Sequence, residues 1–196
     1  MTYELTTLTI APGRMNDALA LLPERVPADL IGAWGTEFGQ VNDVLLLRRR
    51  TDDAASSTAK PDTGWLGDMG EWTTHVASES YRLMPFSPVP EPGAYGPLHE
   101  MRRYSFRPSA LDELLDTWGQ FAPRRLAMSP GLLMMHSVDG DPLTVIHMWA
   151  YQSLDQRAAL RAQAIAGGIW PAPGGARRWL SQENSLLTPL PFSPLN

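Results

Sequence analysis

The second half of the chain has the clearer pattern of hydrophobic and polar positions. Residues 100–106 alternate as a strand does, and from Ser109 onward apolar residues recur at the spacing of a helix, which Ser109 would cap. Further on, the pattern predicts a hairpin of strands 131–136 and 143–149, a helix over 153–165 and a last strand over 184–190. The expected order is β-α-β-β-α-β, the ferredoxin-like unit.

The first half predicts the same order with more interruptions. A strand over 3–10 is followed by a helix within 14–30, which Pro23 and Pro27 interrupt. The later expected elements are strands 31–38 and 44–49, a surface loop of small and polar residues over 51–64, and helical character over 65–78.

Two short sequences occur once in each half of the chain. Residues 3–12 and 99–108 both have Glu in second place and Pro in tenth, and Pro-Phe-Ser-Pro stands at 85–88 and again at 191–194. This repetition favours a duplication within one α+β chain. The expected units are a divergent ferredoxin-like unit over 1–90, an extended proline-rich linker over 91–98 and a second ferredoxin-like unit over 99–196.

Composition excludes several classes of protein. Of the 196 residues, 43% are hydrophobic and 19% charged, a globular balance that argues against disorder, and no apolar run is long enough to span a membrane. The net charge of -5 argues against a nucleic-acid partner. The absence of cysteine excludes disulfides and thiolate chemistry. The first residues lack the pattern of a signal peptide, so we expect a cytoplasmic protein.

Several segments are similar to those of one known family. The stretch VIHMWAYQSLDQR at 145–157 resembles NIPSNAP sequences most closely, and ENSLL at 183–187, YEL at 3–5 and WGTEFG at 34–39 are similar too. The resemblance covers both halves but is most extensive over 98–195. In the first half, Leu46 and Arg48 stand where the family's His and Trp would be expected.

This resemblance implies a dimeric α/β barrel fold. Two ferredoxin-like sheets would face each other around a cavity, with the helices outside, and here one chain would supply both sheets. Barrels of this kind include cofactor-free monooxygenases, polyketide cyclases, isomerases and haem proteins. The resemblance therefore implies a fold and a range of chemistries, and it does not name a reaction.

Strand alternation divides the candidate site residues between two faces of the sheet. Glu100, Arg102 and Tyr104 share one face of their strand, as His147 and Trp149 do on theirs. Helices pack on apolar side chains, so we expect this polar and aromatic set to line the barrel cavity. The opposite face carries Met101, Arg103, Ile146 and Met148.

The residue types in this set suit proton transfer. An imidazole ordinarily titrates near neutral pH, so His147 could act as an acid, a base or a ligand. Glu100 could abstract an acidic proton, with Arg102 stabilising the resulting enolate and Tyr104 donating a hydrogen bond. The residues expected to bind substrate are Trp149, His136, Trp34 and Arg48. The alternatives are a structural histidine at 147 and a structural ion pair between Glu100 and Arg102.

Two functional hypotheses follow. The first is a cofactor-independent enzyme, an isomerase, cyclase or dehydratase or of the monooxygenase type, acting on a largely apolar metabolite of secondary metabolism. The second is a non-catalytic protein that binds a small molecule, or haem through His147 or His136. The sequence has no metal-ligand spacing and no phosphate-binding glycine loop. We expect no metal and no cofactor besides the haem alternative, and either a monomer with an internal pseudo-dimer or a homodimer.

Overall fold

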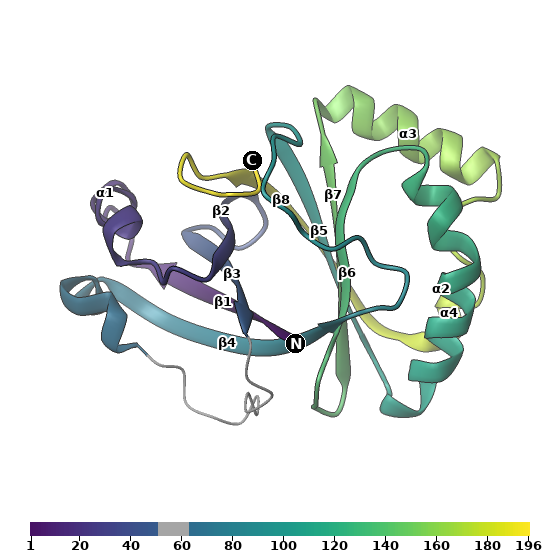
Figure 1. Ribbon diagram of the computed structural model, residues 1–196, viewed down its shortest axis with the longest axis horizontal. Helices are drawn as coiled ribbons and strands as arrows, with labels where there is room; N and C mark the ends of the chain where they lie inside the picture. Colours follow the sequence, from purple (N-terminus) through teal and green to yellow (C-terminus); the bar gives the residue numbers. More distant parts are fainter. Residues whose placement is uncertain (51–62) are drawn as a thin grey trace.

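Eight antiparallel strands close into a barrel in the computed structural model, which describes residues 1–50 and 63–196 (Figure 1). In chain order the strands are β1 (Thr2–Ile10), β2 (Leu30–Phe38), β3 (Asp43–Arg50), β4 (Thr73–Leu83), β5 (Leu98–Phe106), β6 (Gly131–Ser137), β7 (Leu143–Tyr151) and β8 (Trp179–Pro189). Around the barrel they follow the order β1-β3-β2-β8-β5-β7-β6-β4.

Each half of the chain contributes four consecutive strands to this barrel. The order is β4-β1-β3-β2 in the first half and β8-β5-β7-β6 in the second, so the same arrangement occurs twice. The halves join where β2 pairs with β8 and where β4 pairs with β6. The predicted fold, two ferredoxin-like units forming a barrel of the dimeric α/β type, is confirmed, and one chain closes the whole barrel.

Helices cover the outside of the barrel. In the first half these are α1 (Met15–Arg25) and the 3-10 segment η1 (Gly64–Glu71). In the second half, Figure 1 shows a wall of longer helices: after η2 (Pro108–Ala110) come α2 (Leu111–Leu126), α3 (Leu154–Ala166) and the short α4 (Gly175–Arg178). In the part of the chain that the structure describes, no helix is both long and apolar enough to cross a membrane.

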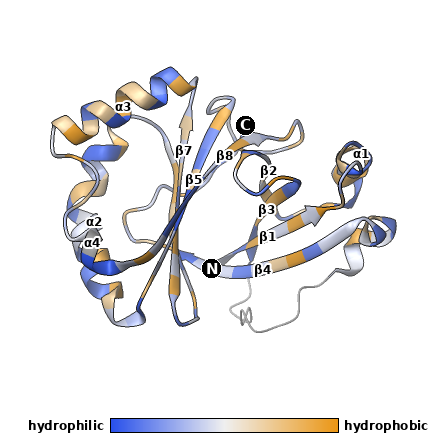
Figure 2. Ribbon diagram, turned by 180° about the vertical axis from the view of Figure 1, so that it is seen from behind, coloured by the Kyte–Doolittle hydropathy of each residue, from blue (hydrophilic) through white to orange (hydrophobic). Residues whose placement is uncertain are grey.

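The barrel interior is an apolar core to which both halves contribute. Leu5 and Leu47 from the first half pack there with Met101, Ile146 and Met148 from the second. Figure 2 shows hydrophobic positions distributed over the strands of both halves. Because alternate residues of a strand face opposite sides, filling the interior with these side chains sends their neighbours outward toward the helices.

The repeated Pro-Phe-Ser-Pro segments connect the two halves. The Ser87 hydroxyl accepts a hydrogen bond of 2.8 Å from the backbone N–H of Met134 in β6, and the Ser193 hydroxyl accepts one of 2.9 Å from Ala33 in β2. In each case the segment that follows the last strand of one half binds the second strand of the other half. Each copy of the repeated segment therefore links its own half of the barrel to the other half; we call these two links the serine joints.

Three local predictions are wrong. Helical character was expected through Ser78, but the helix is only η1, and β4 begins at Thr73, where alternating residues pair with β1. Ser109 does not cap α2, since η2 precedes the helix and Ala110 occupies the cap position without a side-chain hydrogen bond. The helix expected within 14–30 is shorter and runs from Met15 to Arg25, and Pro23, which was expected to interrupt it, lies inside it. Most of the loop predicted over 51–64 lies outside the described residues.

Candidate functional site

The polar and aromatic face of β5 and β7 points toward the helices and not into the barrel. Tyr104, Val145 and Trp149 pack in one cluster with Trp118 of α2, whereas Met101 and Met148 lie in the barrel core. The prediction that this face lines a barrel cavity is wrong. Apolar side chains fill the barrel core beside this part of the sheet, whereas the helices of the second half stand over a cavity that takes larger and charged groups.

A cavity of about 310 Å³ lies between this sheet face and the helices. Its ionisable lining residues are Glu100, Arg102, Arg125 and Arg161. Its aromatic lining residues are Tyr104, Trp118, Trp149, Tyr151, Trp170 and Trp179. The volume and the mixture of aromatic walls with a few polar groups are typical of a site for a small organic molecule.

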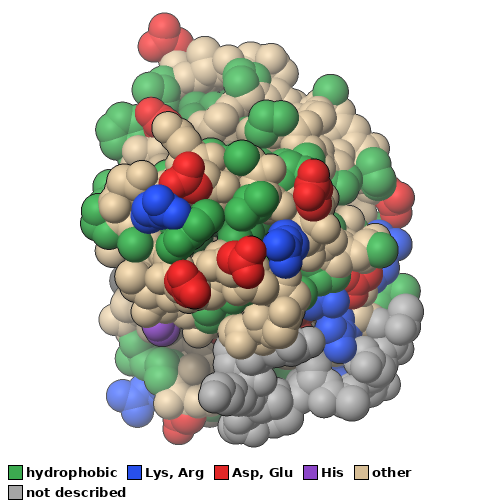
Figure 3. Space-filling view, turned by 90° about the vertical axis from the view of Figure 1, so that its left-hand side faces the viewer, with side chains coloured by type: hydrophobic (Ala, Val, Ile, Leu, Met, Phe, Trp, Pro, Cys, Tyr) green, Lys and Arg blue, Asp and Glu red, His purple; other side chains and the backbone are tan. Residues whose placement is uncertain are grey.

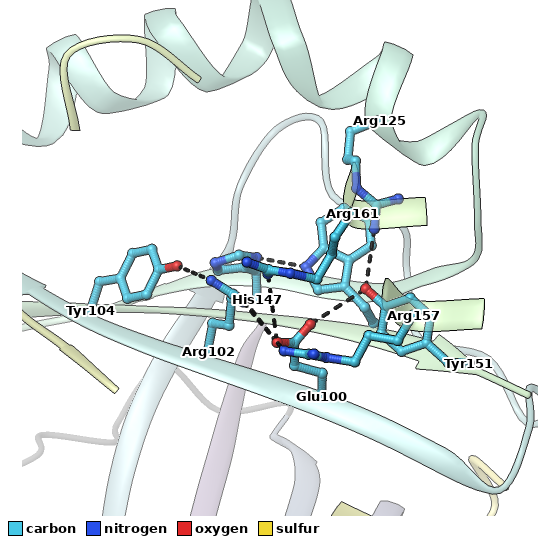
Figure 4. A network of polar contacts seen from close by, with 9 residues as sticks. Glu100, Arg102, Tyr104, Arg125, His147, Tyr151, Arg157 and Arg161 are labelled. Atoms are coloured by element: carbon cyan, nitrogen blue, oxygen red, sulfur yellow. Dashed lines mark hydrogen bonds and ion pairs between the residues drawn. The ribbon is translucent and has the colours of Figure 1, made fainter. Parts of the chain in front are cut away.

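Glu100 of β5 is the centre of the polar network in this cavity (Figure 4). Its carboxylate is 1% exposed, and its Oε1 accepts hydrogen bonds of 3.0 and 2.9 Å from Nε and Nη2 of Arg102. Arg157 of α3 also donates to Oε1, and Nη1 of Arg161, one turn later, lies 3.8 Å away. Three guanidinium groups therefore share one carboxylate oxygen.

The other oxygen of Glu100 is less engaged. Oε2 accepts one long hydrogen bond, 3.4 Å from the Tyr151 hydroxyl. Burial raises the pKa of Tyr151 to about 12, with Glu100 acting in the same direction, so this phenol stays protonated at neutral pH and serves as a donor. Arg102 extends the network by donating a 2.9 Å hydrogen bond to Tyr104.

Arg125 of α2 completes the network by contacting both Tyr151 and Trp149. Its Nη2 donates to the Tyr151 hydroxyl at 3.2 Å and its Nη1 donates to Ser129 at 2.6 Å. The guanidinium lies 4.0 Å from the centre of the Trp149 ring, which is cation–π distance.

His147 lies behind the cavity wall. It is fully buried and is absent from the cavity lining. Its Nδ1 accepts a 2.8 Å hydrogen bond from the Trp149 indole, which requires that nitrogen to be unprotonated. Burial lowers the pKa of His147 well below its usual value, and Arg102 and Arg125 add to the effect. This geometry suits a neutral histidine that orients Trp149, and it does not suit a base or a haem ligand in the cavity.

Of the other predicted residues, Glu100, Arg102, Tyr104 and Trp149 come together in the cavity and three do not. Trp34 lies in the barrel core, where its indole donates a 2.7 Å hydrogen bond to His99. His136 lies outside the cavity lining, with Nδ1 2.9 Å from the carbonyl of Ser137. Arg48 lies on β3, opposite β7 across the barrel, and pairs with Asp29 and Glu4.

Sequence reasoning missed the contributions of the helices. Arg125 stands seven residues after Trp118, in the same helical stripe, and Arg157 and Arg161 are four apart on α3. An arginine in an apolar stripe signals either a buried ion pair or a ligand contact. That signal was present for Arg125, but only the tertiary structure shows which helix covers which sheet face.

A second hollow, of about 850 Å³, opens at one end of the barrel. It is lined by hydroxyl, amide and charged residues, and Arg103 forms a two-pronged ion pair there with Glu79, at 2.9 and 2.7 Å. Within residues 1–50 and 63–196, no group of three or more His, Asp or Glu side chains has the arrangement of a metal site.

Comparison with known proteins gives concordant matches. The sequence profile of the NIPSNAP family matches residues 99–194. The NipSnap homolog of Dictyostelium discoideum is 26% identical over 186 residues, covering 86% of this chain and 77% of the relative. NipSnap homolog 2 of mouse is 25% identical over 88% of this chain, which spans only 65% of that protein. The crystal structure of a proposed monooxygenase from Lactobacillus acidophilus covers 96% of this chain and is itself covered to 93%, with a TM-score of 0.61 at 12% identity, a likeness of fold alone.

Proposed function

The chain belongs to the NIPSNAP family, and from the cavity of its second half we propose that it binds a flat, largely apolar small molecule and catalyses proton transfer within it. The observation that carries the proposal is the asymmetry of Glu100. One oxygen of this buried carboxylate is held by guanidinium groups, and the other has a single 3.4 Å hydrogen bond.

In this proposal the proton of an acidic C–H or O–H bond passes to Oε2 of Glu100. The electron pair stays on the substrate as an enolate or phenolate, which Arg102 and the Tyr104 hydroxyl stabilise. Return of the proton to a different atom completes an isomerisation, or the first step of a cyclisation or dehydration. This proton transfer needs no oxidant and no cofactor. His147 acts here only as a positioning residue for the Trp149 wall.

The experiment follows hydrogen–deuterium exchange at the activated carbon of 2-tetralone, a flat bicyclic ketone, by proton NMR in D₂O. The wild-type protein is expected to accelerate exchange, and Glu100→Gln and Glu100→Asp are expected to reduce the acceleration about 10²–10⁴-fold. Glu100→Asp keeps the charge that the arginines need and displaces the oxygen. Glu4→Gln, the corresponding change in the first half, is the matched control.

Two outcomes would count against the enzyme. If folded Glu100→Asp protein accelerates exchange as well as wild type, Glu100 is not the base. If wild-type protein binds 2-tetralone without accelerating exchange, the second candidate function, non-catalytic binding of a small molecule, takes its place. One observation favours that candidate: three guanidinium groups surround Oε1, so Glu100 already serves as their counter-ion.

A further inference from the structure

Within the described part of the chain, Arg125 is a buried cation with no carboxylate in direct ion-pair contact. It is 2% exposed, and its hydrogen-bond partners are the neutral hydroxyls of Ser129 and Tyr151. Among residues 1–50 and 63–196, no carboxylate lies within 4.0 Å of its guanidinium nitrogens. Burying a charge in this way is costly unless an opposite charge compensates it.

Four other arginines of the second half do have carboxylate partners; Arg178 is buried, and the remaining three are partly exposed. Arg102, Arg157 and Arg161 share Glu100, and Arg178 lies 3.3 Å from Glu113. Glu100 is thus already the counter-ion of three cations, and the cavity lining carries one acidic side chain against three arginines. The cavity lining has an excess of positive charge, and among its described residues Arg125 is the arginine with no carboxylate in ion-pair contact; its link to Glu100 runs through the Tyr151 hydroxyl.

The surroundings of Arg125 are flat and aromatic. Its guanidinium lies over the Trp149 ring at 4.0 Å, and Trp118 and Trp170, whose ring centres are 4.8 Å apart, line the same cavity. A guanidinium has five N–H donors in a planar fork, and two hydrogen bonds to hydroxyls leave donors to spare. Such a fork binds a carboxylate with two parallel hydrogen bonds.

Resting on the proposed function, we infer that the small molecule is a planar aromatic acid whose carboxylate binds Arg125 while its rings lie against the tryptophans. The ligand supplies the missing counter-ion, so Arg125 selects acids over neutral molecules of the same shape. Glu100 and Arg102 act on another part of the same molecule.

The test compares 2-naphthoate with 2-naphthamide, which has the same shape and no charge, by isothermal titration calorimetry. Wild-type protein is expected to bind the acid about 10–100-fold more tightly than the amide. In Arg125→Gln the ratio of the affinity for the acid to the affinity for the amide is expected to fall close to one, with the affinity for the amide little changed. Arg125→Lys, which keeps the charge and loses the fork, is expected to retain part of the preference for the acid. The matched control is Arg124→Gln, which removes an exposed charge from the same helix turn and should keep the full preference.

Equal affinity of wild-type protein for acid and amide would overturn this inference while leaving the proposed function intact, and this comparison requires no variant to fold. An acid preference that survives in Arg125→Gln would also overturn it. Absence of binding for both probes would overturn the proposed function together with the inference.

Discussion

The two halves of the barrel place a glutamate at the same position and surround it differently. In register, Glu4 of β1 faces Arg48 of β3, as Glu100 of β5 faces Trp149 of β7. Glu4 is 20% exposed and pairs at 3.3 Å with Arg48, which is 14% exposed. Glu100 is 1% exposed and is enclosed by arginines from its own strand and from α3.

The neighbours of the two glutamates explain the difference. The register places Thr6, Leu8 and Leu46 where the second half has Arg102, Tyr104 and His147. Leu8 and Leu46 are fully buried and pack against α1, so the space beneath this helix is filled. Figure 3, which views the molecule from the α1 side, shows acidic, basic and hydrophobic side chains intermixed there.

This contrast shows how two halves with the same strand arrangement can differ in whether they form a cavity. Strand order and the serine joints are alike in both halves, and they require only backbone pairing and one serine hydroxyl at each joint. A cavity requires helices that stand away from the sheet and side chains that line the gap. Among the residues that the structure describes, only those of the second half provide both, so the first half serves as a natural control for the second.

The largest expected difference between the halves is in the cost of neutralising each glutamate. Glu100→Gln removes a buried carboxylate that three partly exposed guanidinium groups share as a counter-ion, and it is expected to lower the free energy of unfolding by about 3–5 kcal/mol. Glu4→Gln is expected to cost under about 1 kcal/mol, because its ion pair is partly exposed. Urea unfolding of both variants measures the difference, and equal costs would contradict it.

The next effect concerns the two buried Trp–His pairs, one in the barrel and one behind the cavity. Burial lowers the pKa of His99 to about 4 and that of His147 well below its usual value. The unfolded chain binds these protons more readily than the folded protein. The free energy of unfolding is therefore at its full value above about pH 6.5 and decreases as the pH falls toward 4, by roughly 3 kcal/mol for His99 alone.

Melting temperatures between pH 7.5 and 4.5 measure this loss. His99→Gln is expected to flatten the decline, since glutamine keeps an acceptor for Trp34 and does not titrate. His136→Gln, at a partly exposed position, is the control and should leave the slope unchanged. A variant lacking His99 with the same decline as wild type would count against the barrel pair as its source.

The smallest expected effect concerns the serine joints, the feature that the two halves share. Ser87→Ala and Ser193→Ala each remove one hydroxyl acceptor from a backbone N–H of the opposite half, and each is expected to cost about 1 kcal/mol. Chemical unfolding of the two variants should give similar values, because each hydroxyl accepts one backbone hydrogen bond of nearly equal length, 2.8 and 2.9 Å. Ser181→Ala, at an exposed side-chain pair, should cost less. Clearly unequal costs would show that the joints are not equivalent.

Local sequence patterns predicted much of the fold. Period-two alternation predicted β5 and β7, the hairpin turn predicted β6 beside β7, and Ser153 caps α3 as its position indicates, accepting from Gln156 at 3.1 Å. The match between 3–12 and 99–108 anticipated two equivalent units, and alternation grouped Glu100, Arg102 and Tyr104 on one face. All of these depend on residues near one another in the chain.

Only the tertiary structure decided which side of the sheet this group faces. Alternation is symmetric, so it separates two faces without saying which one packs inside the barrel and which lies under the helices. The same holds for Arg125 and Arg157, because the approach of α2 and α3 to Glu100 depends on helix packing across more than twenty residues of chain. The sequence determined the elements and the chemical groups on each, and long-range packing decided which of those groups meet in a cavity.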